Sequence, residues 1–287
     1  MADFEVIFMD AGQGDCTLIV YPDGTLTLVD CGSTKSGAAA FEQIKIVVNQ
    51  RLKESKSYVN VVLTHPDEDH YNLLSKLDVK GKISDQLVHA YYGGDIELYR
   101  NARENDFTYD FLSHFKEHGL AGPPENATSV VPEGGLSRAG VNVTILAANC
   151  TGRPAATDGH SKNSNSIVLL VEYQGAKIFL MGDAFEQTEK FIMSSFKTAG
   201  ALARLQKQPG EHVVLKMGHH GSDTSTHSDW VKLIQPEVLV VSSGTKSFSG
   251  KGMPTKAHLA LTVQNSQMTT TDIDQSYVVF DEAKRGV

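Results

Sequence analysis

Short apolar runs separated by turn residues dominate the N-terminal part of the chain. These runs are rich in Val, Ile, Leu and Phe, and Gly, Pro or Asp residues lie between them, a pattern typical of β-strands. The expected strands are Phe4–Met9, Cys16–Tyr21, Leu26–Val29 and Tyr58–Leu63. Between the last two, Ala38–Leu52 has apolar residues at helical spacing and is predicted to form a helix.

The middle of the chain mixes the two kinds of pattern. Tyr71–Leu77 is typical of a short helix, and Val141–Leu146 is typical of a strand. Between them we expect a strand near Gln86–Ala90 and helices near Asp95–Glu104 and Tyr109–Glu117.

The C-terminal half repeats the style of the first half. Ser166–Glu172 and Lys177–Met181 predict a hairpin around Gln174-Gly175, and Ser228 is a candidate N-cap for a following helix. The other expected elements are helices at Ala184–Lys197, Asp229–Ile234 and Ala257–Val263 and strands at Glu211–Met217 and Val238–Ser242. Strands followed by strand–helix units, twice over, predict an α/β fold in which two packed sheets carry helices outside, as one domain over residues 1–287.

Composition and charge exclude several classes of protein. Hydrophobic residues make up 40% of the 287 residues and charged residues 21%, which excludes a disordered chain. The apolar runs are too short to cross a bilayer, residues 1–5 contain no basic region typical of a signal peptide, and three cysteines are an odd number. We therefore expect a cytoplasmic protein without a membrane partner. A formal net charge of −8 disfavours a general duplex-binding surface but leaves room for a local basic groove.

Polar clusters follow the ends of several expected strands. The densest comes directly after Tyr58–Leu63 and reads His65-Pro66-Asp67-Glu68-Asp69-His70. Divalent cations bind imidazole nitrogen and carboxylate oxygen, so this cluster is a candidate metal site. Acidic residues also favour the start of a helix, but two histidines bracketing the carboxylates favour the metal interpretation.

Three further clusters are ambiguous when taken singly. Asp183 could cap a helix beginning at Ala184, and Asp30 could lie in a turn or orient a ligand histidine. The paired histidines between glycines have little structural reason to exist, although a surface loop would also accommodate them. These clusters are Asp30-Cys31-Gly32, Met181-Gly182-Asp183 and Gly218-His219-His220-Gly221-Ser222.

In this order, the clusters resemble the metallo-β-lactamase superfamily, and within it the nuclease-like domain of ComEC-type competence proteins and their stand-alone relatives. The resemblance extends from about Phe4 to Phe280 and implies a four-layer αββα sandwich with two divalent metal ions at one edge. The segments that carry it are Met9-Asp10-Ala11-Gly12-Gln13-Gly14-Asp15, Thr64–His70, Asn163-Ser164-Asn165-Ser166, Gly182-Asp183 and Lys216–Ser222.

The resemblance also implies a set of metal ligands. His65 and Asp67 would hold the first ion, and Asp69 and His70 the second. Asp183 would bridge the two ions, and one of His219 and His220 would complete the second site. Asp67 stands where the superfamily usually has a histidine, as in the ComEC-like branch, and this oxygen-rich set suits zinc or manganese.

Further residues have weaker assignments, each beside a structural alternative. Asp69 would orient the attacking hydroxide, and Lys216 and Ser222 are candidates to stabilise charge on the substrate, although Lys216 could instead be a surface-facing strand residue. His160 is a possible extra ligand or a solvated loop residue. Possible contacts to substrate or to a metal-bound water come from Asn163 and Asn165, which could equally form a turn, and Asp15 and Asp30 could support the ligands from behind or satisfy local backbone groups.

The resemblance implies a phosphodiesterase that attacks single-stranded nucleic acid or a nucleotide through a metal-bound hydroxide. One departure concerns a His-Pro-His-Pro element usual in the ComEC-like branch: the chain has Gly252-Met253-Pro254-Thr255-Lys256 there, with His258 further on. The alternatives are a lactone or thioester hydrolase of the same fold, which Asp67 disfavours, and a metal-binding regulatory module without catalysis. Nothing in the sequence indicates an oligomeric state.

Overall fold

Two mixed β-sheets form the centre of the molecule. The structure is a computed structural model, and it describes residues 3–34, 38–54, 59–77, 83, 87–114, 135–196, 198–243, 247–248, 251–252, 267–270 and 276–280. The first sheet has the order β14 (Ser276–Phe280), β1 (Phe4–Phe8), β2 (Cys16–Val20), β3 (Leu26–Cys31), β4 (Val59–Leu63), β5 (Leu87–Tyr92). The second has the order β13 (Gln267–Thr270), β10 (Val238–Val241), β9 (His212–Lys216), β8 (Ala176–Leu180), β7 (Val168–Tyr173), β6 (Asn142–Ala147). A separate pair joins β11 (Ser247–Phe248) to β12 (Lys251–Gly252).

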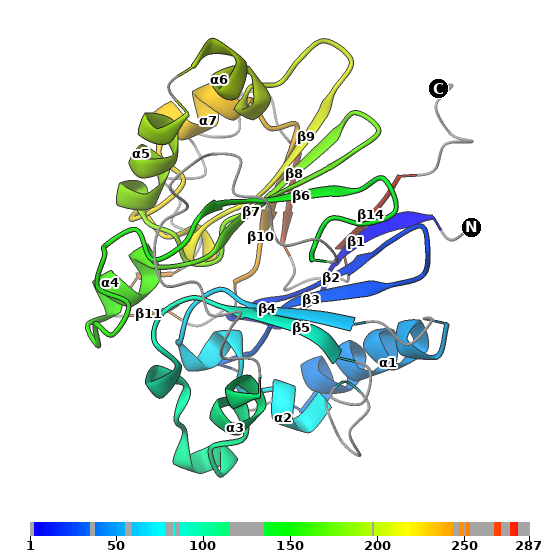
Figure 1. The fold of residues 1–287 in the computed structure, drawn as a ribbon, viewed down its shortest axis with the longest axis vertical. Coiled ribbons are helices and arrows are strands. Elements are labelled where there is room, and N and C mark those ends of the chain that lie inside the picture. Colours follow the sequence, from blue (N-terminus) through cyan, green and yellow to red (C-terminus); the bar gives the residue numbers. More distant parts are fainter. Residues whose placement is uncertain are drawn as a thin grey trace.

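Helices cover the outer faces of the two sheets, as Figure 1 shows. Those on the first sheet are α1 (Ala38–Glu54), α2 (Leu74–Leu77) and α3 (Phe107–Ser113), and those on the second are α5 (Glu186–Ser195), α6 (Ala199–Leu205) and α7 (Ser228–Ile234). The short helix α4 (Gly159–Ser164) lies at the edge, and the 3-10 turns include η1 (Glu68–His70), η3 (Ile96–Tyr99), η4 (Ala102–Glu104) and η6 (His219–Gly221). The predicted αββα sandwich is confirmed.

The direction of the strands brings distant loops to one edge of the sandwich. In the first sheet β3 pairs with β4 in parallel, and in the second β8 pairs with β9 in parallel. Parallel neighbours end at the same edge of their sheet, so the loops that follow them are neighbours too. Four loops far apart in the sequence can therefore contribute to one site.

The hydrophobic core explains why the strands are continuous apolar runs. The inner faces of both sheets pack together, with Phe4 and Ile19 from one sheet and Leu169 and Ile178 from the other in one buried cluster. Helices cover the outer faces; the Trp230 ring of α7, for example, meets Phe179 edge-on at 5.5 Å. Strands covered on both faces need no alternation of polar and apolar residues.

Some element boundaries differ from the sequence-based expectation. Helix α5 begins at Glu186 with Phe185 as its N-cap, so the expectation that Ala184 starts the helix and Asp183 caps it is wrong. The N-cap of α7 is His227, and Ser228 is already helical. The stretch Asp95–Glu104 forms two 3-10 turns instead of one helix, and the side chains of Asp95 and Asn101 each cap the start of one turn. The expected helix Ala257–Val263 lies outside the described residues.

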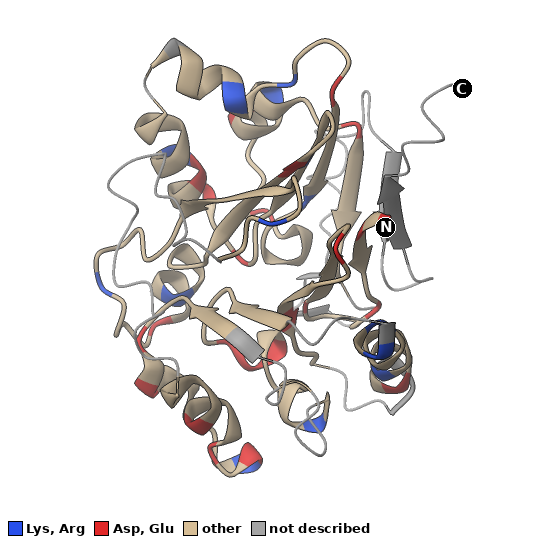
Figure 2. Cartoon of the chain, turned by 45° about the vertical axis from the view of Figure 1, so that its right-hand side comes forward, with Lys and Arg blue, Asp and Glu red and all other residues tan. Residues whose placement is uncertain are grey.

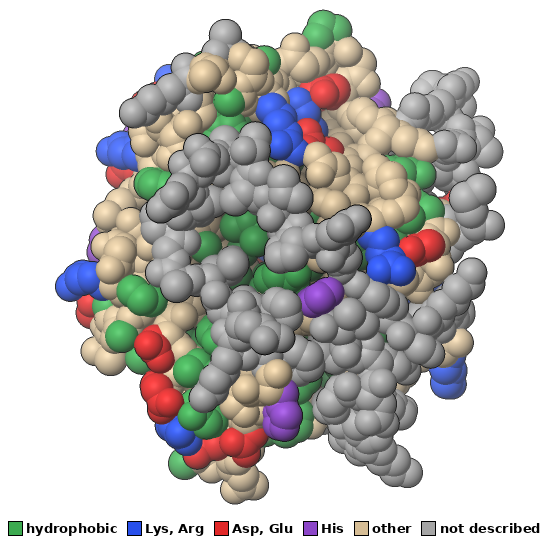
Figure 3. Space-filling view, in the orientation of Figure 1, with side chains coloured by type: hydrophobic (Ala, Val, Ile, Leu, Met, Phe, Trp, Pro, Cys, Tyr) green, Lys and Arg blue, Asp and Glu red, His purple; other side chains and the backbone are tan. Residues whose placement is uncertain are grey.

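Charged side chains of both signs are interspersed on the surface. Figure 2 shows Lys and Arg spread over several elements among Asp and Glu, and on the face in Figure 3 basic and acidic side chains adjoin. The pairs Arg138–Asp23, at 2.7 Å, and Lys45–Glu42, at 3.3 Å, are of this kind. Among the helices that the structure describes, none combines the length and apolarity needed to span a membrane.

Two glycines allow the loops after β1 and β3 to lie against the loop after β4. Asp15 N donates to Asp69 O at 3.1 Å, and Gly32 N donates to Asp15 O at 3.0 Å. A Cβ atom at Gly32 would lie 2.3 Å from the Asp69 carbonyl carbon, and one at Gly14 would lie 2.5 Å from Gly32 O. Both approaches are to backbone atoms, which cannot swing aside, so only glycine fits at these positions.

We expect Gly32→Ala to destabilise the protein by about 1–3 kcal/mol, because the added methyl group forces backbone segments apart. Chemical denaturation measures this free energy of unfolding. The matched control is Gly200→Ala in α6, where a Cβ atom meets nothing within 4 Å and the substitution is expected to be neutral or stabilising. Equal unfolding free energies for Gly32→Ala and the parent protein would contradict the close packing described above.

Candidate metal centre

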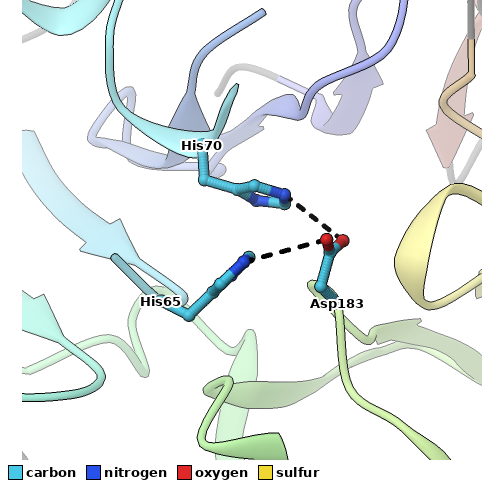
Figure 4. Close-up of side chains that lie close together, drawn as sticks. All are labelled: His65, His70 and Asp183. Atoms are coloured by element: carbon cyan, nitrogen blue, oxygen red, sulfur yellow. Dashed lines mark ion pairs between the residues drawn. The ribbon is translucent and has the colours of Figure 1, made fainter. Parts of the chain in front are cut away.

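Side chains from the loops after β4 and β8 meet at the edge of the sandwich. Figure 4 shows His65, His70 and Asp183 pointing toward one another. His70 Nε2 lies 3.2 Å from Asp183 Oδ1, and His65 Nε2 lies 3.7 Å from Asp183 Oδ2. Gly182, with a φ of 54°, turns the chain after β8, and the Asp183 amide then donates to Ser166 Oγ at 3.2 Å. Asp183 therefore belongs to this cluster and not to a helix cap.

The loop after β9 adds His220 to the same cluster. His220 Nε2 lies 3.3 Å from Asp69 Oδ2 and 3.5 Å from Asp183 Oδ2. Its neighbour His219 faces the other way, with Nδ1 2.7 Å from Thr224 Oγ1 and its ring centroid 4.9 Å from that of Phe185. The left-handed φ values of both histidines separate their side chains in this way. Of the two histidines, the structure thus brings His220 into the cluster.

Asp30, near the end of β3, controls the orientation of two of these imidazoles. Its Oδ2 accepts from His70 Nδ1 at 2.8 Å and from Thr64 Oγ1 at 2.7 Å. Because Thr64 donates its hydroxyl hydrogen to Asp30, Thr64 Oγ1 can only accept from His65 Nδ1, which lies 3.1 Å away. A carboxylate accepts hydrogen bonds and donates none, so both Nδ1 atoms carry the proton and both Nε2 lone pairs face Asp183.

A backbone carbonyl does the same for His220. Its Nδ1 lies 2.8 Å from Ser242 O, and a carbonyl oxygen only accepts, so Nδ1 is the protonated nitrogen of the neutral ring. The Nε2 lone pair then faces Asp69 and Asp183. This arrangement, in which the far nitrogen of each ligand histidine donates to a fixed acceptor, is typical of metal-binding imidazoles.

Several buried polar atoms of the cluster make no hydrogen bond within the protein. Among the described residues, His65 Nε2, His70 Nε2, His220 Nε2 and Asp183 Oδ1 are buried without a hydrogen bond. Such atoms are rare in folded proteins because each costs free energy. The sets His65, His70, Asp183 and Asp69, His70, His220 each offer ligand atoms within 4.8 Å of one another. Imidazole nitrogens and carboxylate oxygens at this spacing fit a divalent cation.

The electrostatics of the cluster favour charge despite its burial. Burial alone would lower the pKa of His70, but the carboxylates of Asp183 and Asp30 outweigh it and raise the pKa well above its ordinary value. Burial likewise opposes ionisation of Asp183, yet His220 and His70 hold its pKa well below the usual range. In the protein without metal, a second proton on His70, at Nε2, would compensate these carboxylates, and a metal cation would displace that proton on binding and take the Nε2 lone pair.

Asp15 and Lys216 lie behind the histidines. Lys216 is only 3% exposed, so the alternative of a surface-facing strand residue is wrong. Its ammonium pairs with Asp15 and donates to Met217 O at 3.3 Å. Asp15 Oδ1 lies 3.7 Å from His220 Nδ1, and its Oδ2 lies 4.0 Å from His70 Nδ1. Asp15 therefore contacts the protonated side of both rings, and Lys216 balances its charge.

The remaining candidates lie around the cluster. His160 is exposed on α4, with Nε2 3.4 Å from Gln187 Oε1, and it contacts none of the clustered ligands that the structure describes. The Asn165 carboxamide accepts from Thr151 Oγ1 at 2.7 Å and so fixes a loop. Ser222 Oγ accepts from Thr224 Oγ1 at 3.1 Å. Asp67 contacts His65 at 3.6 Å and also Lys162 and Asn163 from α4.

Three contributions to the site were not assigned from the sequence. Thr64 could have been suspected, because a hydroxyl directly before His65 lies at the strand end. Ser242 acts through its carbonyl, which no residue type signals. Lys162 reaches Asp67 across 95 positions in the sequence, from a short polar helix without apolar periodicity, so no local pattern connects the two.

A cleft of about 620 Å³ opens beside the cluster. Its lining carries four carboxylates and two cations, and one of the cations, Arg103, pairs with Glu68 at 3.0 Å; the charged residues are Asp67, Glu68, Asp69, Glu104, Lys76 and Arg103. A cleft of this size is typical of sites for small molecules. A substrate in it would lie next to Asp67 and Asp69.

Comparisons with known proteins agree with this geometry. A family model described as the metallo-beta-lactamase superfamily matches residues 9–245. ComE operon protein 3 of Bacillus subtilis (strain 168) is 25% identical over 251 residues, which cover 84% of this chain and 28% of that protein. Recombination protein 2 of Haemophilus influenzae (strain ATCC 51907 / DSM 11121 / KW20 / Rd) is 27% identical over 241 residues, 84% of this chain and 24% of that protein. The chain thus spans about a quarter of the length of these curated relatives.

A solved structure shares the fold. The metallo-beta-lactamase fold protein YhfI from Bacillus subtilis superposes with a TM-score of 0.53 at 10% identity, covering 97% of this chain and all of that chain.

We expect Asp30→Asn to weaken divalent metal binding by about 10–100-fold, the usual loss when the acceptor behind a ligand histidine is removed. Asn tolerates the left-handed φ of 55° at this position, so the fold is expected to persist. Competition for Zn²⁺ against a chromophoric chelator measures the affinity. The control is Asp95→Asn. Asp95 is the N-cap of η3, and Asn preserves this capping role without touching the ligand histidines. An Asp30→Asn affinity equal to that of the control would refute the orienting role of Asp30.

Proposed function

The chain belongs to the metallo-beta-lactamase superfamily, and we propose that it is a metal-dependent phosphodiesterase that acts on single-stranded nucleic acid or a nucleotide. The observation that carries this proposal is the convergence of three imidazole Nε2 atoms with Asp183 beside an open cleft. Each imidazole is held from behind by an acceptor, and each lone pair is left for a ligand.

The proposed centre holds two divalent ions, zinc or manganese. His65 and Asp67 would serve one ion, and Asp69, His70 and His220 the other, with Asp183 between them. This set offers as many carboxylates as imidazoles, and such mixed sets suit zinc as well as the harder manganese ion. When bound, divalent ions make water a nucleophile near neutral pH and offset the charge of a phosphodiester.

The protein's own groups then position the reactants. Asp30 and the Ser242 carbonyl keep protons on the Nδ1 atoms, so the Nε2 faces stay available. The burial of His65, His70, His220 and Asp183 at the edge of the sandwich lowers the dielectric around them, which strengthens the charge interactions in the cluster. Asp69, in the wall of the cleft, has a pKa lowered below its ordinary value: burial opposes this, but the charges of His220 and His70 outweigh it. Asp69 is thus ionised and faces the approaching substrate.

The substrate class rests on charge, cleft size and relatives. Arg103 and Lys76 line the cleft among four carboxylates, and Arg103 pairs with Glu68 at 3.0 Å, so most of the positive charge for an anionic substrate would come from the proposed ions. The formal net charge of −8 disfavours a general duplex-binding surface. The names of the curated relatives refer to recombination and competence, processes that handle nucleic acid. Asp67 in place of a histidine disfavours the lactone and thioester hydrolases of the same fold.

Asp69→Asn is expected to fold normally and to lose turnover by about three orders of magnitude, because the substitution keeps the side-chain shape but removes one ligand charge. Turnover of bis-p-nitrophenyl phosphate is measured while Mn²⁺ is titrated into metal-stripped protein, alongside thermal melts. Asp229→Asn is the control, since its carboxylate is exposed and pairs with Lys232 on the surface. Near-parental turnover in a folded Asp69→Asn protein would sink the proposed mechanism.

The substrate class is tested with a panel of single-stranded DNA, a cyclic nucleotide, bis-p-nitrophenyl phosphate and a lactone, each with Mn²⁺ or Zn²⁺. We expect hydrolysis of at least one phosphodiester and none of the lactone. Hydrolysis of the lactone alone would replace the proposal by the lactonase alternative. Metal binding without any turnover would favour a regulatory module.

A further inference from the structure

Asp67 differs from the other proposed ligands because the protein already satisfies both of its carboxylate oxygens. Oδ1 pairs with the Lys162 ammonium. Oδ2 accepts from the Asn163 amide nitrogen at 3.1 Å, in the orientation of that amide that satisfies its neighbours. His65 Nε2 also lies 3.6 Å from Oδ2. The Nε2 atoms of the cluster have no such partners among the described residues.

The two halves of the centre are therefore unequal. One half has Asp69, His70, His220 and Asp183, whose neighbouring atoms lie 3.2–3.5 Å apart. The other half has His65 and Asp67 and shares Asp183 with the first half, but Asp67 already forms an ion pair with Lys162. Asp67 belongs to none of the three-residue groups that offer an ion ligand atoms within 4.8 Å in the described part of the chain.

The ion pair between Lys162 and Asp67 is partly buried, so its attraction is stronger than that of a fully exposed pair. The side chains are 22% and 26% exposed, so the surrounding protein screens the attraction less than bulk water would. Burial disfavours ionised Asp67, but the nearby His65 and Lys162 outweigh it and lower its pKa. An ion that binds Asp67 must first compete with a cation that is covalently part of the chain.

Helix α4 fixes the backbone of Lys162, but the side chain can still move away from Asp67. The Asp158 carboxylate caps the helix by accepting from Ser161 N at 2.9 Å, and Arg153 donates to Ser161 Oγ at 2.7 Å. The lysine side chain is 22% exposed and has four rotatable bonds, so it can turn to solvent without moving the helix.

We propose that Lys162 occupies the place of a cation beside Asp67, so that the two metal positions fill in order. The position of Asp69, His70, His220 and Asp183 binds first and tightly, and the position of His65 and Asp67 binds second, when the second ion displaces Lys162. At low metal concentration the protein holds one ion and uses the lysine ammonium as its second positive charge. This inference rests on the metal centre of the proposed function.

Metal binding by itself tests the inference. Isothermal titration of Mn²⁺ into the metal-stripped full chain, with elemental analysis of the bound metal, is expected to give two classes of site that differ at least about tenfold in affinity. In Lys162→Met the weaker class should tighten by about fivefold, the scale of a partly exposed ion pair, while the tighter class stays unchanged. Lys162→Arg keeps the charge and should leave the weaker class weak.

The matched control is Lys190→Met, since Lys190 also pairs with a carboxylate on a helix, Glu186 at 2.6 Å, but lies on the surface. Its titration should equal that of the parent protein, and thermal melts confirm that all variants are folded. Two equivalent sites in the parent protein, or an unchanged or weakened second site in Lys162→Met, would overturn the inference. Because the readout is binding, a protein that binds as described but hydrolyses no phosphodiester would sink the proposed function and leave this inference standing.

Discussion

The Asp30 carboxylate is the constraint on which the metal centre depends. It accepts from His70 Nδ1 directly and from His65 through the Thr64 hydroxyl, and its other oxygen accepts from Thr64 N at 2.7 Å. These bonds fix the side on which two imidazoles carry their protons. They exist because β3 and β4 run parallel and in register, with Val29 opposite Val62, so that the ends of both strands lie together. The chemistry at the edge is thus set by strand pairing in the sheet.

The rest of the structure holds this edge in place. Gly14 and Gly32 let two backbone segments contact the Asp69 carbonyl, and the Asp15–Lys216 pair fills the space behind His70 and His220. Buried charges are costly unless they are paired, and here nearly every charge has a partner within the protein. The buried atoms that make no hydrogen bond include the three Nε2 atoms and Asp183 Oδ1, and these face the proposed ions.

Sequence patterns predicted the sandwich well because both sheets are covered on both faces, which makes each strand a continuous apolar run with turn residues around it. The strand-end clusters also identified His65, His70 and Asp183, which the fold brings together. Other features depend on backbone turns and long-range contacts. His219 and His220 differ only in where two left-handed residues point their side chains. The burial of Lys216 depends on its contact with Asp15, which is 201 positions away in the sequence. Helix α4 is polar and has no apolar periodicity, so the sequence did not predict it.

The placement of the ions tests this account most directly. Crystals of the full chain soaked in Mn²⁺ and measured at a wavelength with strong anomalous scattering would locate each ion. The account predicts a first anomalous peak in contact with Asp69, His70, His220 and Asp183, and a second peak beside His65 and Asp67 only at higher Mn²⁺, with Lys162 turned away. Ions bound elsewhere on the protein, with the imidazole Nε2 atoms left without any ion, would contradict it.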